Sequence, residues 1–170
     1  YQGRESLPIP LLNIINGGKH ASTNIALQEF QIIPDLNKTF SRNLEAGSEI
    51  WHSLGRILEE NKIDSDVGSE GGYAPNVNDI EEVFQYLLAA IERAGYKAGE
   101  QVCLGLDAAA TSFVNQSATS YSIAPPPAKL SPLELGNKYK DWLNRYPLIS
   151  LEDPFAEEAW PDWQKLTAEI

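Results

Sequence analysis

The sequence predicts an α/β fold in which strands followed by helices build a sheet with parallel strands. The apolar pattern gives two strands, two helices and then two strand–helix units, and such units are typical of parallel sheets. Asp107 and Glu152 stand at the ends of apolar strands, where α/β barrels hold their reactive groups. The chain has 170 residues, of which 42% are hydrophobic, so it can bury one core and we expect one domain.

Four segments have the length and apolar content of buried strands. They are residues 9–15, 28–33, 102–107 and 148–151. One further short strand is expected at residues 121–123, within a polar region. The proline run 125–127 follows it, and because proline cannot donate to a strand ladder we expect an exposed loop there. The polar residues 1–6 are interpreted as a linker that enters the domain.

Apolar residues that return every three or four positions predict four helices. They cover residues 40–60, 80–94, 131–145 and 160–170. Asn78 and Glu81 are spaced as a capping box before the second helix. Ser131 is the expected cap of the third helix, with Pro132 in the first position and Glu134 in the third.

Charge and composition exclude several classes of function. The net charge of -11 and the pI of 4.6 argue against nucleic acid or an anionic membrane as the main partner. No apolar run approaches the length of a membrane helix. The single cysteine, Cys103, excludes an internal disulfide and indicates a reducing compartment or indifference to redox conditions. It lies in an apolar run where we expect a buried, inert thiol. The chain does not begin with methionine, which suggests a piece of something longer.

The segment 13–30, NIINGGKHASTNIALQEF, joins the first two predicted strands. Its paired glycines allow backbone angles that other residues avoid and let the main chain approach a ligand. His20 and Glu29 each lie beside a strand end, so both side chains can face one pocket. The alternative is a surface loop in which His20 is merely solvated, and the loop alone favours neither interpretation. The other histidine, His52, has no partner motif and is interpreted as a surface or packing residue.

Three more segments of this kind follow, each containing a carboxylate beside glycines or at the end of an apolar run. They read VGSEGGYAP (67–75), LGLDA (104–108) and ISLEDPF (149–155). With the first segment they resemble, in the same order, the first half of the catalytic barrel of the enolase (phosphopyruvate hydratase) family. The resemblance implies a partial TIM-like barrel over residues 7–170, with about four of the eight strands. The two-strand, two-helix opening is also the opening of the enolase barrel. An open half-barrel exposes two strand edges and an inner face that we expect to be apolar.

The resemblance implies a lyase that reversibly dehydrates 2-phospho-D-glycerate to phosphoenolpyruvate with Mg²⁺. Removal of a proton beside a carboxylate creates an enolate-like dianion, which divalent metal ions stabilise. Asp107 and Glu152 match two of the three carboxylate ligands of the metal; on spacing alone, caps or salt-bridging acids are the favoured interpretation. Glu70 and Glu29 match the pair that helps the substrate hydroxyl leave, and shared carboxyls keep one protonated. His20, Gln28, Glu29 and Glu152 are the expected substrate-binding residues.

The chain departs from the family pattern at three positions. Ser69 stands where aspartate is usual, Lys19 where a small residue is usual, and Ser112 where glutamate is usual. The family's third metal aspartate, its lysine base, its phosphate-binding groups and its separate N-terminal domain have no counterpart in the chain. We therefore expect a fragment that is inactive alone, from a cytoplasmic enzyme that forms a homodimer or a higher homo-oligomer. The alternatives are a truncated, non-catalytic interaction module and another enzyme of the enolase superfamily.

Overall fold

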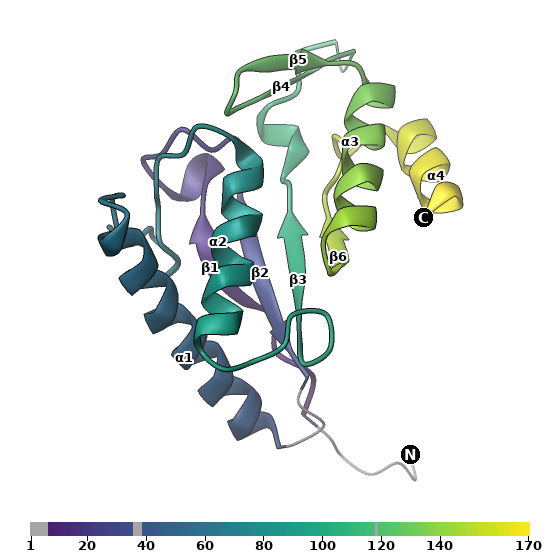
Figure 1. Cartoon of the computed structure of the whole chain (residues 1–170). Coiled ribbons are helices and arrows are strands. Elements are labelled where there is room, and N and C mark those ends of the chain that lie inside the picture. The colour runs from purple at the N-terminus through teal and green to yellow at the C-terminus, as the bar shows by residue number, and fades with distance from the viewer. Residues whose placement is uncertain (1–6, 36–38, 118) are drawn as a thin grey trace, which may run out of the picture.

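A computed structural model of the chain describes residues 7–35, 39–117 and 119–170, and the linker expected at residues 1–6 lies outside these residues. The predicted order of two strands, two helices and two strand–helix units is confirmed (Figure 1). The elements are β1 (Leu12–Asn16), η1 (Gly18–His20), β2 (Glu29–Pro34), α1 (Phe40–Glu60), α2 (Ile80–Arg93), β3 (Val102–Asp107), η2 (Ala110–Ser112), β4 (Tyr121–Ile123), β5 (Ala128–Leu130), α3 (Pro132–Arg145), β6 (Leu148–Glu152) and α4 (Trp160–Glu169).

The main sheet has the strand order β1-β2-β3-β6. Strand β2 runs antiparallel to both of its neighbours, whereas β3 and β6 are parallel. The expectation of a parallel sheet is therefore wrong for β2. The reason is the connections. A loop without a crossover helix joins β1 to β2, and parallel neighbours need such a crossover. Two helices, α1 and α2, join β2 to β3, and they return the chain to the end of the sheet at which β2 finishes, where Pro34 pairs with Val102. Helix α3 supplies the crossover between the parallel strands β3 and β6.

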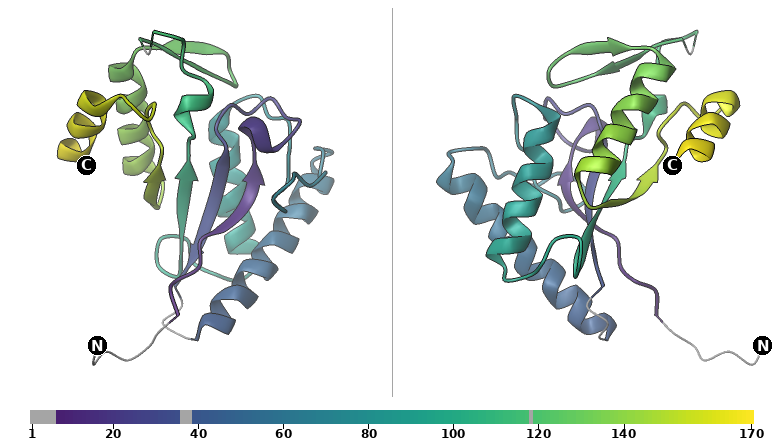
Figure 2. Two further views of the ribbon diagram at one scale, coloured as in Figure 1. Left: turned by 180° about the vertical axis from the view of Figure 1, so that it is seen from behind. Right: turned by 45° about the vertical axis from the view of Figure 1, so that its right-hand side comes forward.

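Helices α1, α2 and α3 cover one face of the sheet, and the view from behind shows strands β1 to β3 uncovered (Figure 2). The helix-covered face carries the core. On this face Phe30 and Ile32 of β2 lie beside Leu104 and Leu106 of β3, and all four are fully buried. Phe84 of α2 meets Phe30 edge to face, with ring centroids 5.4 Å apart. Burial of these apolar side chains fixes the register of the two central strands.

The opposite face of the sheet is mainly polar, with Ile33 and Cys103 paired on it at the other end of β2 from Glu29, so the expectation of an apolar inner face is wrong. Register partners on neighbouring strands share a face. Gln31 of β2 pairs with Gly105 of β3, and Gly105 pairs with Ser150 of β6. The next residues on this face, at the carboxyl ends of β3 and β6, are the carboxylates Glu29, Asp107 and Glu152. Polar side chains alternate with apolar ones over the first four residues of β2, Glu29 to Ile32, because only one face of the strand meets the helices.

The first turns of the helices follow local capping rules. The capping box of α3 is confirmed, since the Ser131 side chain accepts from the backbone N–H of Glu134 and the Glu134 carboxylate accepts from Ser131. The cap predicted for α2 is wrong by one position. Asp79, rather than Asn78, accepts from the N–H of Glu81 at 2.8 Å. Both residues can cap, and the structure shows which one adopts the extended backbone that a cap needs.

The region after β3 forms a hairpin that lies over one end of the sheet (Figure 1). The short strand expected at 121–123 is confirmed as β4, and it pairs with β5. The proline run forms the turn between them; Pro126 and Pro127 are exposed as expected, but Pro125 is buried. Cys103 is half-buried and free, and burial raises the pKa of its thiol, in keeping with an inert group. Among the described residues no helix is long and apolar enough to cross a membrane.

Candidate active site

A row of four polar residues crosses the uncovered face of the sheet at one end. Asn16 of β1 pairs with Glu29 of β2, Glu29 pairs with Asp107 of β3, and Asp107 pairs with Glu152 of β6. Strands β1, β3 and β6 reach this row at their carboxyl ends, and β2 reaches it at its first residue because it runs the other way. The register therefore brings together the strand-end acids that the sequence singled out. Three adjacent carboxylates share one edge of the sheet.

The loop after β1 folds back so that His20 lies beside this row. Gly17 donates to the carbonyl oxygen of Gln28 at 2.8 Å. A Cβ atom on Gly17 would lie 2.2 Å from the carbonyl oxygen of Leu27, so no larger residue fits there. Gly18 has a φ of +53°, which favours glycine. The paired glycines thus press the loop against the segment before β2 and bring His20 next to Glu29.

Glu70 comes from the loop between α1 and α2. The loop crosses the end of β1 closely: a Cβ on Gly72 would lie 2.1 Å from Oδ1 of Asn16. The indole N–H of Trp51 donates to the carbonyl of Gly71 at 2.9 Å and ties the loop to α1. Ser69 ties it to the histidine loop, since both its backbone N–H and its hydroxyl donate to the carbonyl of His20, at 3.1 and 3.0 Å.

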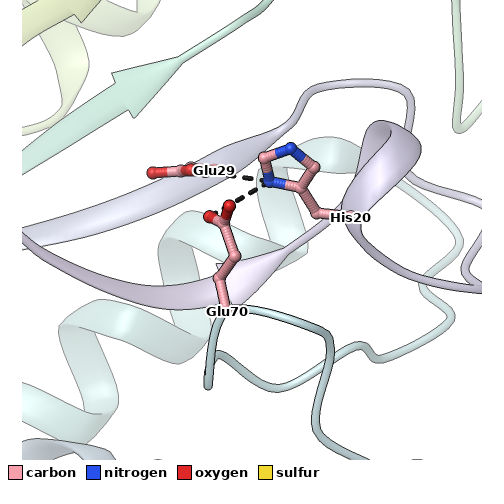
Figure 3. Close-up of side chains that lie close together, drawn as sticks. All are labelled: His20, Glu29 and Glu70. Carbon is pink, nitrogen blue, oxygen red and sulfur yellow. Dashed lines mark ion pairs between the residues drawn. The ribbon is translucent and has the colours of Figure 1, made fainter.

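The side chains of His20, Glu29 and Glu70 converge from three separate segments (Figure 3). Nδ1 of His20 lies 3.1 Å from Oε2 of Glu70 and 3.6 Å from Oε1 of Glu29. Burial of the Glu29 carboxyl, followed by its hydrogen bond to Glu70, raises the pKa of Glu29. The same hydrogen bond lowers the pKa of Glu70, with further contributions from His20 and Asn13. Of the two carboxyls, Glu29 therefore binds a proton more tightly than Glu70.

Asp107 and Glu152 form the other part of the row. Asp107 is 8% exposed, and its Oδ1 accepts from the backbone N–H of Ala109 at 2.9 Å. The side-chain amide of Gln28 donates to its Oδ2 at 3.3 Å. Gln28 thus contacts Asp107, while His20 contacts Glu29 and Glu70. The structure brings every sequence-predicted site residue to this one edge.

Comparison with known proteins shows the family to which the chain belongs. The family profile described as "Enolase, C-terminal TIM barrel domain" matches residues 4–170. The chain belongs to the enolase family. It is 41% identical, over 164 residues, to the enolase of Bdellovibrio bacteriovorus. That match covers 96% of this chain but 38% of the relative, so the chain spans less than half the length of the relative. The open four-stranded sheet is accordingly part of an enolase TIM-barrel domain.

The acidic part of this enolase-family site fits a divalent cation. Burial raises the pKa of Asp107, and the nearby Asp153 adds to that effect. Burial also raises the pKa of Glu152, and the charges of Asp107 and Asp153 raise it further. Each carboxylate is thus destabilised by desolvation and by its acidic neighbours. A bound cation removes that repulsion, and hard carboxylate oxygens are the ligands Mg²⁺ prefers.

Sequence reasoning missed three amide side chains at this enolase-family site. Among the described residues, Oδ1 of Asn13 and both amide atoms of the fully buried Asn16 have no hydrogen-bond partner. Buried polar atoms without partners are uncommon and mark places where a ligand or water completes the bonding. Gln31 is the third, and it donates to Oε2 of Glu29 at 3.0 Å. The alternation of polar and apolar residues in β2 was the available signal for Gln31.

Proposed function

We propose that the protein carrying this chain is a phosphopyruvate hydratase, which reversibly dehydrates 2-phospho-D-glycerate to phosphoenolpyruvate. The observation that carries the proposal is the row of three carboxylates Glu29, Asp107 and Glu152, with His20 and Glu70 at its end, in a chain of the enolase family. This dehydration needs an acid for the leaving hydroxyl and a place for negative charge on the substrate carboxylate. The row offers both within one edge of the sheet.

The pair Glu29 and Glu70 supplies the acid. Burial and the hydrogen bond to Glu70 raise the pKa of Glu29, so this carboxyl binds a proton more tightly than a free glutamate does, close enough to Glu70 for the two to share it. A proton held there is positioned to pass to the departing hydroxyl oxygen. His20 and Gln28 line the same edge and orient the substrate, and the Ser69 hydrogen bonds hold the His20 loop against the Glu70 loop. Closure of the His20 loop over the substrate excludes water in the way that enzyme lids do.

Asp107 and Glu152 are the chain's own ligands for Mg²⁺. Their adjacency and their raised pKa values fit a site that is completed by a cation. When bound, Mg²⁺ supplies positive charge that stabilises the negative charge developing on the substrate carboxylate. Asp107 is held in place for this role by the Ala109 N–H and the Gln28 amide. We also propose that this chain alone is inactive, and that the complete enzyme is a cytoplasmic homodimer or higher homo-oligomer.

The three departures from the family pattern leave the proposed reactive groups in place. Ser69 retains a function, because it holds the His20 carbonyl without adding a charge beside Glu70. Lys19 and Ser112 are both exposed at the surface. Their side chains therefore bear on loop behaviour and rate rather than on the existence of the site.

The test is an assay of phosphoenolpyruvate formation, followed by absorbance, on the 170-residue chain and on the longest reading frame that contains it. Each protein is measured with Mg²⁺ and again with a chelator. We expect turnover of 2-phosphoglycerate by the longer protein alone, and its loss with chelator. An extended, folded protein that does not turn over this substrate with Mg²⁺ contradicts the proposal. A reading frame that stops near residue 170 favours a non-catalytic interaction module instead.

A further inference from the structure

The turn at residues 68–72 carries Glu70 away from the body of the protein. Backbone bonds inside the turn join the N–H of Gly71 to the carbonyl of Gly68 at 3.2 Å, and the N–H of Gly68 to the carbonyl of Gly72 at 2.8 Å. Glu70 is 43% exposed at its side chain, and a Cβ on Gly71 would meet no atom within 4 Å. Bonds inside the turn give it its shape but not its position. The position of Glu70 therefore depends on contacts between the turn and other elements.

Trp51 of α1 makes the contact at the peptide next to Glu70. Its indole N–H donates to the carbonyl of Gly71 at 2.9 Å. The indole ring also stacks on the ring of Tyr73, with the ring centroids 4.5 Å apart and the planes inclined by 19°. Stacking sets the plane of the indole, and the plane of the indole sets the direction in which its N–H points. The two interactions together aim the N–H at the turn.

The helix and the strand behind this contact are held by the core. Leu54, nearly one turn after Trp51 in α1, is fully buried. A Cβ on Gly55 would lie 2.3 Å from the hydroxyl oxygen of Tyr73, so the side chain of Tyr73 packs directly on the backbone of α1. The N–H of Tyr73 donates to the carbonyl of Ile14 in β1 at 2.9 Å. Trp51 thus joins the Glu70 turn to a part of the fold that does not move with the turn.

The carboxylate of Glu70 has only a weak tether of its own among the described residues. The Asn13 amide donates to it at 3.4 Å, which is long for a hydrogen bond. We propose that Trp51 is a positioning residue, whose indole N–H holds the Gly71 peptide and so keeps the Glu70 carboxylate beside His20 (Figure 3). The effect of Trp51 on turnover rests on the proposed function, but its hold on the turn does not.

Packing alone is the alternative role for Trp51, and kinetics separates the two roles. A residue that only stabilises the fold lowers Tm when it is changed, but the folded protein keeps its kcat. A positioning residue for Glu70 acts on the step in which the hydroxyl leaves, so its loss lowers kcat while KM changes little. Displacing a reacting group by about 1 Å costs on the order of a hundredfold in rate. A small movement of the turn is therefore enough to be measured.

The first test is Trp51→Phe in the longest reading frame that contains the chain. Phenylalanine keeps a ring to stack on Tyr73 but has no N–H for Gly71. We expect kcat for 2-phosphoglycerate to fall roughly tenfold or more, with KM within about twofold of the unchanged protein. The matched control is Trp163→Phe on α4, which also removes an indole N–H bonded to a backbone carbonyl, that of Ala156 at 3.1 Å. Its kcat is expected to stay the same.

The second test asks whether Trp51 acts through Glu70. Trp51→Phe is combined with Glu70→Gln, which removes the carboxylate that the turn positions. In this background we expect Trp51→Phe to change the residual kcat by less than about twofold, because the two residues then serve one function. Circular dichroism confirms that each variant is folded. If Trp51→Phe does not fold, Trp51→Tyr replaces it, since tyrosine also keeps the ring and lacks the indole N–H.

The third test measures the turn itself, without substrate. Amide hydrogen exchange is followed by mass spectrometry over residues 67–75, where the N–H groups of Gly68, Ser69 and Gly71 are all hydrogen-bonded. Loss of a contact that holds a loop increases local opening and speeds exchange. We expect exchange in this segment to be roughly fivefold faster or more in Trp51→Phe, and unchanged in Trp163→Phe.

A folded Trp51→Phe protein with the kcat of the unchanged protein overturns the proposal. Equal falls of kcat in Trp51→Phe and Trp163→Phe overturn it as well, and so does a full further loss in the Glu70→Gln background, because Trp51 then acts elsewhere. Unchanged exchange over residues 67–75 in Trp51→Phe also overturns it, whether or not the protein turns over 2-phosphoglycerate. An unchanged protein without turnover, in which Trp51→Phe still speeds exchange as expected, contradicts the proposed function alone.

Discussion

Asp107 and Glu152 are register partners on the parallel strands β3 and β6, so their carboxylates project side by side from the same end of the sheet. This pairing sets the first prediction. Asp107→Asn removes one of the two adjacent carboxylates that we propose as Mg²⁺ ligands, and it is expected to lower the affinity for Mg²⁺ at least tenfold, a loss of about 1.4 kcal/mol or more. Isothermal titration calorimetry with MgCl₂ measures it on the longest reading frame that contains the chain.

The control for this prediction is Asp141→Asn on α3, an exposed acid that pairs with Arg145 at 2.8 Å. It removes the same charge and leaves the row untouched, so Mg²⁺ affinity should stay the same. Equal losses in the two variants would mean that Mg²⁺ responds to the overall charge and that Asp107 is no ligand.

The second prediction concerns the stability of the metal-free chain. Burial, Asp107 and Asp153 raise the pKa of Glu152 above 4.5, so the folded state binds its proton more tightly than the unfolded state. Above pH 4.5 the Glu152 carboxyl ionises in the unfolded chain more readily than in the folded chain, so the free energy of unfolding falls as the pH rises through this value. Glu152→Gln removes the repulsion, and we expect a higher Tm than the unchanged chain at pH 7 without metal. The difference should shrink as the pH falls and vanish below 4.5.

Thermal unfolding followed by circular dichroism at several pH values measures this difference. The variant should also lose the stabilisation that Mg²⁺ gives to the unchanged protein, because binding to the folded state raises its stability. A Glu152→Gln chain whose Tm is lower than that of the unchanged chain at pH 7 would show that Glu152 is stabilised by its surroundings.

The strand-end acids were predictable from local pattern. Asp107 and Glu152 each follow an apolar run, and the length of one crossover helix between them sets parallel neighbours, which is what the structure shows. The convergence of His20 and Glu70 was not predictable from spacing, because they are 50 positions apart in the sequence, with β2 and α1 between them. Only the resemblance of both loops to one family indicated a common site.

Other features depend on contacts that no local pattern encodes. The apolar content of β2 suggests a strand buried on both faces, although Glu29 and Gln31 alternate with Phe30 and Ile32. That alternation indicates one covered face and one polar face. The burial of Asn16 depends on the loop that carries Gly68 and Gly72, which crosses it from more than fifty residues away. The sequence marks the glycines but does not say which side chain they approach.

The third prediction compares two glycines of the Glu70 loop: Gly72, which is required by close packing, and Gly71, which is required by its backbone conformation. A Cβ on Gly72 would lie 2.1 Å from Oδ1 of Asn16 and 3.0 Å from the backbone of Ile14. Gly72→Ala is therefore expected to cost about 2–3 kcal/mol of unfolding free energy. Gly71 has a φ of +87°, and a Cβ added to it would have no atom within 4 Å. Gly71→Ala therefore meets backbone strain alone and should cost about 1 kcal/mol.

Urea unfolding of the two variants measures the difference, with the unchanged chain as the reference. Equal costs would mean that the loop moves away from Asn16 at little expense. In that case the close approach of the loop to β1 would not fix the position of Glu70.

The last prediction concerns two fully buried tyrosines near the Asp107 end of the sheet. The hydroxyl of Tyr139 on α3 has no hydrogen-bond partner among the described residues, and burial raises its pKa far above 10.0, so it is buried as a neutral, unpaired group. The hydroxyl of Tyr121 accepts from the backbone N–H of Ala156 at 3.0 Å.

Leaving a buried hydroxyl unpaired costs about 1–3 kcal/mol, whereas a satisfied one contributes about 1 kcal/mol. Tyr139→Phe should therefore raise Tm by about 2–4 °C for a stabilisation of about 1 kcal/mol, and Tyr121→Phe should lower it. Differential scanning calorimetry decides between them, and a Tyr139→Phe chain that loses as much stability as the Tyr121→Phe chain would show that the Tyr139 hydroxyl has a bonding partner in solution.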